Sequence, residues 1–172
     1  FDIRKLYLTE FPGVQSASIS GIRKPSATEA LLRQMNSGAL IINYIGHGAP
    51  QLWSDERVLN FTTDFEKIQN GPRQAFWVTA TCDFGRFDNP KEQSFAEEIL
   101  LTPGRCAIAM LTSARLVFAG NNAQFNKQYY RSLFSSSGVT VPIGLSLLQA
   151  RIRTGATTND EKFLILGDPT MR

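Results

Sequence analysis

The chain has 172 residues, of which 42% are hydrophobic, and its formal net charge is +3. This length supports one domain with a buried core and is too short for two. No stretch is long and apolar enough for a transmembrane helix, and no basic run exceeds two residues, so we expect binding neither to nucleic acid nor to a membrane surface.

The chain opens with an expected strand and an expected helix. Residues 1–8 are predicted to form an edge or lead-in strand. Ser26 and Glu29 then match a capping box, in which the Ser26 side chain caps a helix and Glu29 reaches back to the Ser26 amide. This helix is expected to end near Asn36, with Gly38 after its end.

Two apolar runs, residues 39–48 and 75–82, are predicted to form central strands. Both are apolar at successive residues, which is typical of strands buried on both faces of a parallel sheet. The first run delivers His47, the only histidine, and the second ends at Cys82. Ligands bind at the carboxyl ends of such strands, and parallel neighbours lie about 4.8 Å apart. We therefore expect His47 and Cys82 to leave the sheet side by side.

A thiol beside an imidazole is a nucleophile and its base, because the imidazole takes the proton and the thiolate attacks. Taken singly, however, a histidine or a cysteine at a strand end is more often structural. A disulfide between Cys82 and Cys106 is rejected, since the two are expected at opposite edges of the sheet, about 23 Å apart along a seven-residue strand. One histidine and two separated cysteines also make a poor zinc site, so no metal or cofactor is predicted.

The segment after His47 reads as a loop in which Trp53 stands among polar residues. Two interpretations remain open for Trp53, as a wall of a substrate pocket or as a packing residue. Thr62 or Thr63 is expected to cap a short helix that runs to Gln69.

The second half of the chain alternates predicted helices and strands. Ser94 and Glu97 form a second capping box, which opens a helix to about Leu101. The remaining elements are a strand at 105–112 that contains Cys106 as a packing residue, a helix at 121–134, a helix from Pro142 to near Gly155, and a strand at 162–166. This order predicts an α/β fold with a parallel sheet covered by helices on both faces.

Five sequence blocks, in this order, resemble the gingipain family of caspase-like cysteine peptidases: GHGAPQLW, TCDFGRF, SFAEEIL, AIAMLTSARL and FLILGDPTMR. Within that family, TCDFGRF and the following LTSARLVF are more similar to the sortases of the type IX secretion system than to the gingipains. The resemblance implies a caspase-like three-layer sandwich with a mainly parallel sheet. It also implies that residues 1–172 are one catalytic subdomain of a larger peptidase, with another α/β subdomain before it.

The resemblance assigns a role to four residues. His47 matches the catalytic histidine, Cys82 matches the nucleophile, and the N–H groups of Gly48 and Cys82 match the oxyanion hole. Trp53 matches a tryptophan that lines the gingipain specificity pocket. The gingipain acid that selects basic side chains lies before this stretch, so Arg or Lys specificity is not carried over. Thr81 replaces the alanine of gingipains, and Asp55 or Glu56 could orient the histidine.

The expected activity is a cysteine endopeptidase or sortase that removes C-terminal sorting signals from type IX secreted cargo proteins. The implied partners are these cargo proteins, anionic lipopolysaccharide as an acceptor, outer-membrane secretion components and the preceding subdomain. The implied location is the cell surface at the outer membrane. Two alternatives remain, namely a non-catalytic docking module with the same fold and a gingipain-like protease specific for Arg or Lys.

Overall fold

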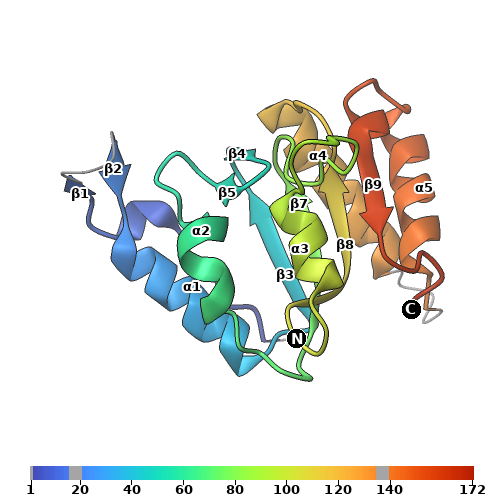
Figure 1. The fold of residues 1–172 in the computed structure, drawn as a ribbon. Coiled ribbons are helices and arrows are strands. Elements are labelled where there is room, and N and C mark those ends of the chain that lie inside the picture. Colours follow the sequence, from blue (N-terminus) through green and yellow to red (C-terminus); the bar gives the residue numbers. More distant parts are fainter. Residues whose placement is uncertain (1, 16–20, 135–139) are drawn as a thin grey trace.

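The computed structural model describes residues 2–15, 21–134 and 140–172. Its centre is a four-stranded sheet with the strand order β3-β7-β8-β9 (Figure 1). The strands are β3 (Ile41–Ile45), β7 (Ala75–Ala80), β8 (Ala107–Ser113) and β9 (Phe163–Leu166). β3, β7 and β8 are parallel, and β9 is antiparallel to β8.

Helices cover both faces of this sheet. On one face lie α1 (Pro25–Ser37), α2 (Phe61–Asp64) and α3 (Phe95–Leu101), and on the other lie α4 (Ala119–Leu133) and α5 (Ile143–Thr154). Each face has its own apolar core, and β7 contributes Trp77 to the first and Val78 to the second. The expected three-layer α/β sandwich is therefore confirmed.

The continuous burial expected of the two central strands holds for only one of them. All six residues of β7 are buried, because this strand has neighbours on both sides and helices on both faces. β3 lies at the edge of the sheet, where Asn43 and Ile45 are exposed. Its apolar sequence indicates a strand correctly but not its place in the sheet.

The strand expected at the start of the chain is wrong. Residues 2–7 have no regular secondary structure and lead into a short 3-10 helix, Leu8–Glu10. A two-stranded hairpin follows, made of β1 (Val14–Gln15) and β2 (Ile22–Arg23). A small antiparallel sheet after His47 consists of β4 (Gly48–Ala49), β5 (Leu52–Trp53) and β6 (Leu59–Asn60). Two further 3-10 helices span Phe65–Lys67 and Asp160–Lys162.

The predicted helix caps are partly confirmed. Ser94 and Glu97 form a complete capping box, and α3 ends at Leu101 as expected. The Ser26 box is wrong, because α1 begins at Pro25, two residues before the start that a Ser26 cap implies. The fixed φ of Pro25 suits the first helical position and leaves Ser26 inside the helix. α2 is capped by the side chain of Asn60 and not by a threonine, and it ends at Asp64.

β9 runs antiparallel to β8, whereas the alternation of helices and strands along the sequence predicts a parallel strand. Two helices, α4 and α5, separate β8 from β9, whereas a single helix separates two parallel strands. These helices pack against each other, so α4 carries the chain away from the carboxyl end of β8 and α5 carries it back (Figure 1). β9 therefore starts beside the end of β8, and Ser113 pairs with Phe163.

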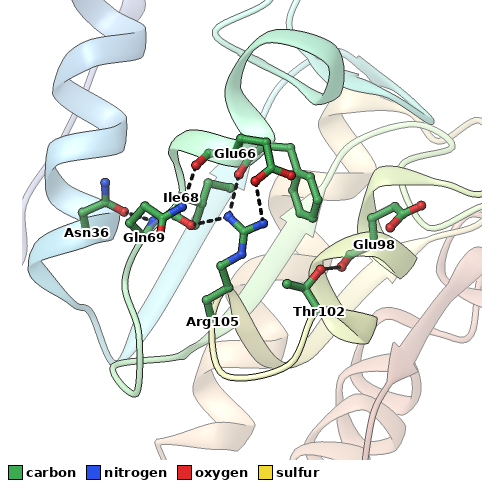
Figure 2. A network of polar contacts seen from close by, with 8 residues as sticks. Asn36, Glu66, Ile68, Gln69, Glu98, Thr102 and Arg105 are labelled. Atoms are coloured by element: carbon green, nitrogen blue, oxygen red, sulfur yellow. Dashed lines mark hydrogen bonds and ion pairs between the residues drawn. The ribbon is translucent and has the colours of Figure 1, made fainter.

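The amino ends of β7 and β8 are held by a polar network that contains no candidate catalytic residue. The Arg105 guanidinium donates to the carbonyls of Phe65 and Ile68, at 3.3 and 2.9 Å, and pairs with Glu66 at 3.1 Å (Figure 2). Beside it, Asn70 accepts from the backbone N–H of Cys106 at 2.6 Å.

Among the described residues, no helix is long and apolar enough to cross a membrane.

Candidate active site

The register of β3 and β7 brings the two candidate catalytic residues to one edge of the sheet. Ile45 is paired with Ala80, and the two strands run parallel. His47 and Cys82 each lie two residues beyond that pair, so both leave the sheet at its carboxyl edge. This register favours the neighbouring placement of His47 and Cys82 that the sequence predicts, and their catalytic pairing stays a prediction. The exposed His47 and the half-buried Cys82 are thus both open to a ligand that approaches this edge.

The backbone of His47 is fixed by two hydrogen bonds to its carbonyl. The Tyr44 hydroxyl donates to this oxygen at 2.7 Å, and the Ser54 N–H donates to it at the same distance. Burial and the nearby Glu56 raise the pKa of the Tyr44 hydroxyl far above its ordinary value, so it keeps its proton as a donor. Within residues 2–15, 21–134 and 140–172, the His47 imidazole forms no hydrogen bond, and neither Asp55 nor Glu56 orients it.

Trp53 is a core residue, and its exposed fraction is only 1%. Its indole stacks on the ring of Tyr44 at 4.4 Å, with 3° between the planes, and contacts the rings of Trp77 and Phe84. Because these rings enclose the indole, it offers no face to a substrate, and the structure favours the packing interpretation of Trp53. Trp53 supports the Tyr44 ring whose hydroxyl holds His47, and its pocket role finds no support in this geometry.

Gly48 is required by close packing. A Cβ at this position would lie 2.3 Å from Oγ1 of Thr81 and 3.2 Å from the carbonyl oxygen of Leu52. Gly48 faces Trp53 in the β4–β5 pair, and the bond from Ser54 N–H to the His47 carbonyl makes this a non-hydrogen-bonded pair. The Gly48 N–H therefore points away from β5, as a donor to a ligand must. Its part in an oxyanion hole stays a prediction.

The Cys82 sulfur is held by one residue of the segment that follows β8. The backbone N–H of Val117 donates to Sγ at 3.4 Å, and the thiol donates to the Val117 carbonyl at 3.4 Å. These two contacts suit both protonation states, because a thiol can donate to the carbonyl and a thiolate can accept from the N–H. Nothing in the sequence around Val117 indicates that its backbone contacts the Cys82 sulfur.

The chain turns sharply after Cys82. Asp83 has a φ of 53°, in the left-handed region that aspartate tolerates better than most residues. Its N–H donates to the Arg115 carbonyl at 3.3 Å, which ties the turn to the segment that contains Val117. Strained backbone of this kind is frequent at functional sites, and here it leaves Cys82 at the tip of the turn.

Behind Cys82, two buried asparagines support both segments. Asn122 donates to the carbonyl of Ala80 at 3.4 Å and accepts from Asn159 at 3.2 Å. The Asn159 side chain also accepts from the N–H of Phe118 at 2.8 Å. The end of β7 and the segment beside Cys82 are therefore linked through the first turn of α4.

Both cysteines are free thiols, as expected. Cys106 has no exposed surface, and burial raises the pKa of its thiol to about 11. The described residues contain no cluster of three or more His, Cys, Asp or Glu side chains that could hold a metal ion.

Comparison with known proteins gives one family and one fold. The model of peptidase family C25 matches residues 1–172. The crystal structure of the Arg-specific cysteine proteinase gingipain R is similar, with a TM-score of 0.72 and 17% identity over 84% of this chain and 35% of that chain. The complex of Porphyromonas gingivalis RgpB pro- and mature domains gives 0.67 and 18%, over 84% and 36%.

A third solved structure, described only as a protease, has a TM-score of 0.57 and 21% identity over 81% of this chain and 36% of that chain. This chain thus spans about a third of the length of the solved proteins it matches. A search of curated proteins finds no match. At these identities the solved structures show the fold, which is the caspase-like fold expected from the sequence.

Proposed function

The chain belongs to peptidase family C25, the gingipain family, and on this premise we propose that it is the catalytic part of a cysteine peptidase with Cys82 as nucleophile and His47 as base. The observation that carries the proposal is the parallel pairing of Ile45 with Ala80, which sets both residues at equivalent places on one sheet edge. A non-catalytic docking module would not need a histidine and a cysteine at matching positions on this sheet edge.

The proposed reaction has two steps. His47 takes the proton of the Cys82 thiol, and the thiolate attacks the carbonyl carbon of the substrate, with N–H groups such as that of Gly48 stabilising the oxyanion. When the tetrahedral intermediate collapses, the C–N bond breaks and His47 gives its proton to the leaving amine. Water or another amine then attacks the thioester and releases Cys82.

For the substrate, we propose the sortase role that the resemblance implies, in which the enzyme removes C-terminal sorting domains from secreted cargo proteins. Transfer of the acyl group to anionic lipopolysaccharide, contact with outer-membrane secretion components and a cell-surface location belong to the same proposal. A preceding α/β subdomain in the intact enzyme, which the resemblance implies, belongs to the same proposal. Incubation of a cargo junction with an amine acceptor, followed by mass spectrometry, distinguishes transfer from hydrolysis.

The catalytic proposal is tested by thiol labelling of the full chain with iodoacetamide at pH 6.5. We expect Cys82 to react at least about tenfold faster than free cysteine, since only about 1% of a free thiol with a pKa of 8.5 is ionised at that pH. His47→Ala should remove the acceleration, and the buried Cys106 is an internal control that should not react. A Cys82 rate equal to that of free cysteine, and unchanged by His47→Ala, would favour the docking module.

A further inference from the structure

Ser113, the last residue of β8, holds the turn around Cys82 at both of its ends. It is fully buried, and β8 lies beside β7, the strand that ends just before Cys82 (Figure 1). The Ser113 hydroxyl donates to the carbonyl of Thr81, and the Ser113 backbone carbonyl accepts from the N–H of Gly85 at 2.9 Å. Because Thr81 and Gly85 lie on the two sides of Cys82, a single serine fixes the backbone before and after the thiol.

The bond to Thr81 bears on the Cys82 N–H, because the Thr81 carbonyl and this N–H belong to the same peptide unit. A trans peptide is planar, with its C=O and N–H pointing in opposite directions, so a bond that fixes the carbonyl also fixes the N–H. Among the residues that the structure describes, none accepts a hydrogen bond from the Cys82 N–H. This donor is therefore open to a ligand, and its direction is set by Ser113.

The same bond also strengthens the donor. When the carbonyl of an amide accepts a hydrogen bond, the amide is polarised and its N–H becomes a better donor, by about 10–30% per bond. The Ser113 hydroxyl carries one hydrogen, which the Thr81 carbonyl shares with the Arg115 carbonyl, 3.1 Å from Oγ. The Arg115 carbonyl also accepts from the Asp83 N–H at 3.3 Å. The hydroxyl thus links the residue before Cys82 to the residue after it.

Two neighbouring hydroxyls indicate that burial alone does not produce these contacts. Thr81 and Thr112 are also fully buried, and within the described part of the chain neither Oγ1 has a hydrogen-bond partner. Thr112 precedes Ser113 on β8, and its side chain packs closely against Gly85. Thr112→Val therefore removes a buried hydroxyl from the same region without removing a hydrogen bond, and it is the matched control for Ser113→Ala.

We propose that Ser113 is a positioning residue, whose hydroxyl directs and polarises the Cys82 N–H towards the carbonyl oxygen of the substrate that Cys82 attacks. This inference rests on the proposed peptidase function. When Sγ of Cys82 bonds to the carbonyl carbon, an electron pair of the C=O bond moves to the oxygen, and the Cys82 N–H donates to that oxyanion. Alkylation of the same sulfur by iodoacetamide displaces iodide and forms no oxyanion. Loss of the Ser113 hydroxyl should therefore slow acylation of Cys82 and leave its alkylation unchanged.

The test measures both reactions in the full chain, with 4-nitrophenyl acetate as the acylating probe and iodoacetamide as the alkylating one. In the acylation, His47 takes the thiol proton, the S–C bond forms, and the C–O bond breaks as 4-nitrophenolate leaves with its electron pair. A whole oxyanion donor is worth about 10²–10³-fold in rate, so we expect Ser113→Ala, which only misaligns one, to slow acylation about tenfold and to change alkylation less than about twofold. Ser113→Thr, which keeps the hydroxyl, and Thr112→Val should retain the wild-type ratio of the two rates.

An unchanged acylation rate in Ser113→Ala would overturn the positioning role. An equal fall of both rates would also overturn it, because Ser113 would then only maintain the fold, and so would the same selective loss in Ser113→Thr or Thr112→Val. The outcome is separable from that of the catalytic proposal. A selective loss of acylation without His47-dependent alkylation would keep the role of Ser113 and reject His47 as the base, whereas His47-dependent alkylation with an unchanged ratio would do the reverse.

Discussion

Replacement of Trp53 separates its two interpretations, because packing and substrate binding predict different losses. The indole is enclosed by Tyr44, Trp77 and Phe84, so Trp53→Ala removes a fully buried side chain and leaves a large cavity. We expect the free energy of unfolding to fall by about 3–5 kcal/mol. Nε1 of Trp53 has no hydrogen-bond partner, so Trp53→Phe loses no hydrogen bond and should cost less than about 1.5 kcal/mol.

The assay for Trp53 is equilibrium unfolding in urea, with iodoacetamide labelling of Cys82 as a second readout. Trp77→Phe is the matched control, since that indole is also buried and lacks a partner for its N–H, but it does not stack on Tyr44. Trp53→Ala should also slow labelling, because Tyr44 loses the ring that positions its hydroxyl against the His47 carbonyl. Unchanged stability of Trp53→Ala together with a lower kcat/KM for a peptide would refute the packing interpretation and favour Trp53 as a wall of a substrate pocket.

Four further results are expected from single sites. Cys82→Ala should abolish cleavage and keep the fold, whereas Cys106→Ala should keep cleavage and lose about 1 kcal/mol in urea unfolding. Gly48→Ala should cost about 1–3 kcal/mol, because the new methyl group meets Oγ1 of Thr81, and adding Thr81→Ala should recover part of that loss. Tyr44→Phe removes a donor to the His47 carbonyl, so stability should fall by about 1 kcal/mol, with a larger effect on kcat than on KM. Unfolded Cys106 loses its proton near pH 8.5, but burial raises the pKa of the folded thiol to about 11. Stability should therefore be full below pH 8.5 and fall towards pH 11, by roughly 2–3 kcal/mol more than in Cys106→Ala.

Several strands and helices could be predicted because the sequence signals that determine them are local. The apolar run of β7 indicates a strand buried on both faces, and its six buried residues agree. The capping box at Ser94 fixes the start of α3, since both partners of the box lie within four residues. Gly155 ends α5 with a φ of 84°, a conformation that glycine adopts without strain. In each case, the residues that determine the structure are neighbours in the sequence.

The features that the sequence does not reveal depend on contacts between residues that are distant in the chain. Trp53 is followed by polar residues and reads as a loop residue, but its burial depends on Tyr44 and Phe84, which come from other segments. Val117 contacts Cys82 across 35 positions, and no local pattern marks a backbone N–H that meets a sulfur. The order of helices and strands predicts a parallel β9, whereas two helices in succession return the chain to the same edge of the sheet.

The two candidate catalytic residues depend on different kinds of structure, and this bears on how the site tolerates change. Cys82 leaves a central strand that is buried and paired on both sides, so its position is fixed by the sheet itself. His47 leaves an edge strand, where a slip of one residue would turn alternate side chains to the opposite face. Its position therefore needs the additional bonds to its carbonyl from Tyr44 and Ser54. The aromatic cluster around Trp53 supports the backbone of His47, so substitutions there should displace His47 before they displace Cys82.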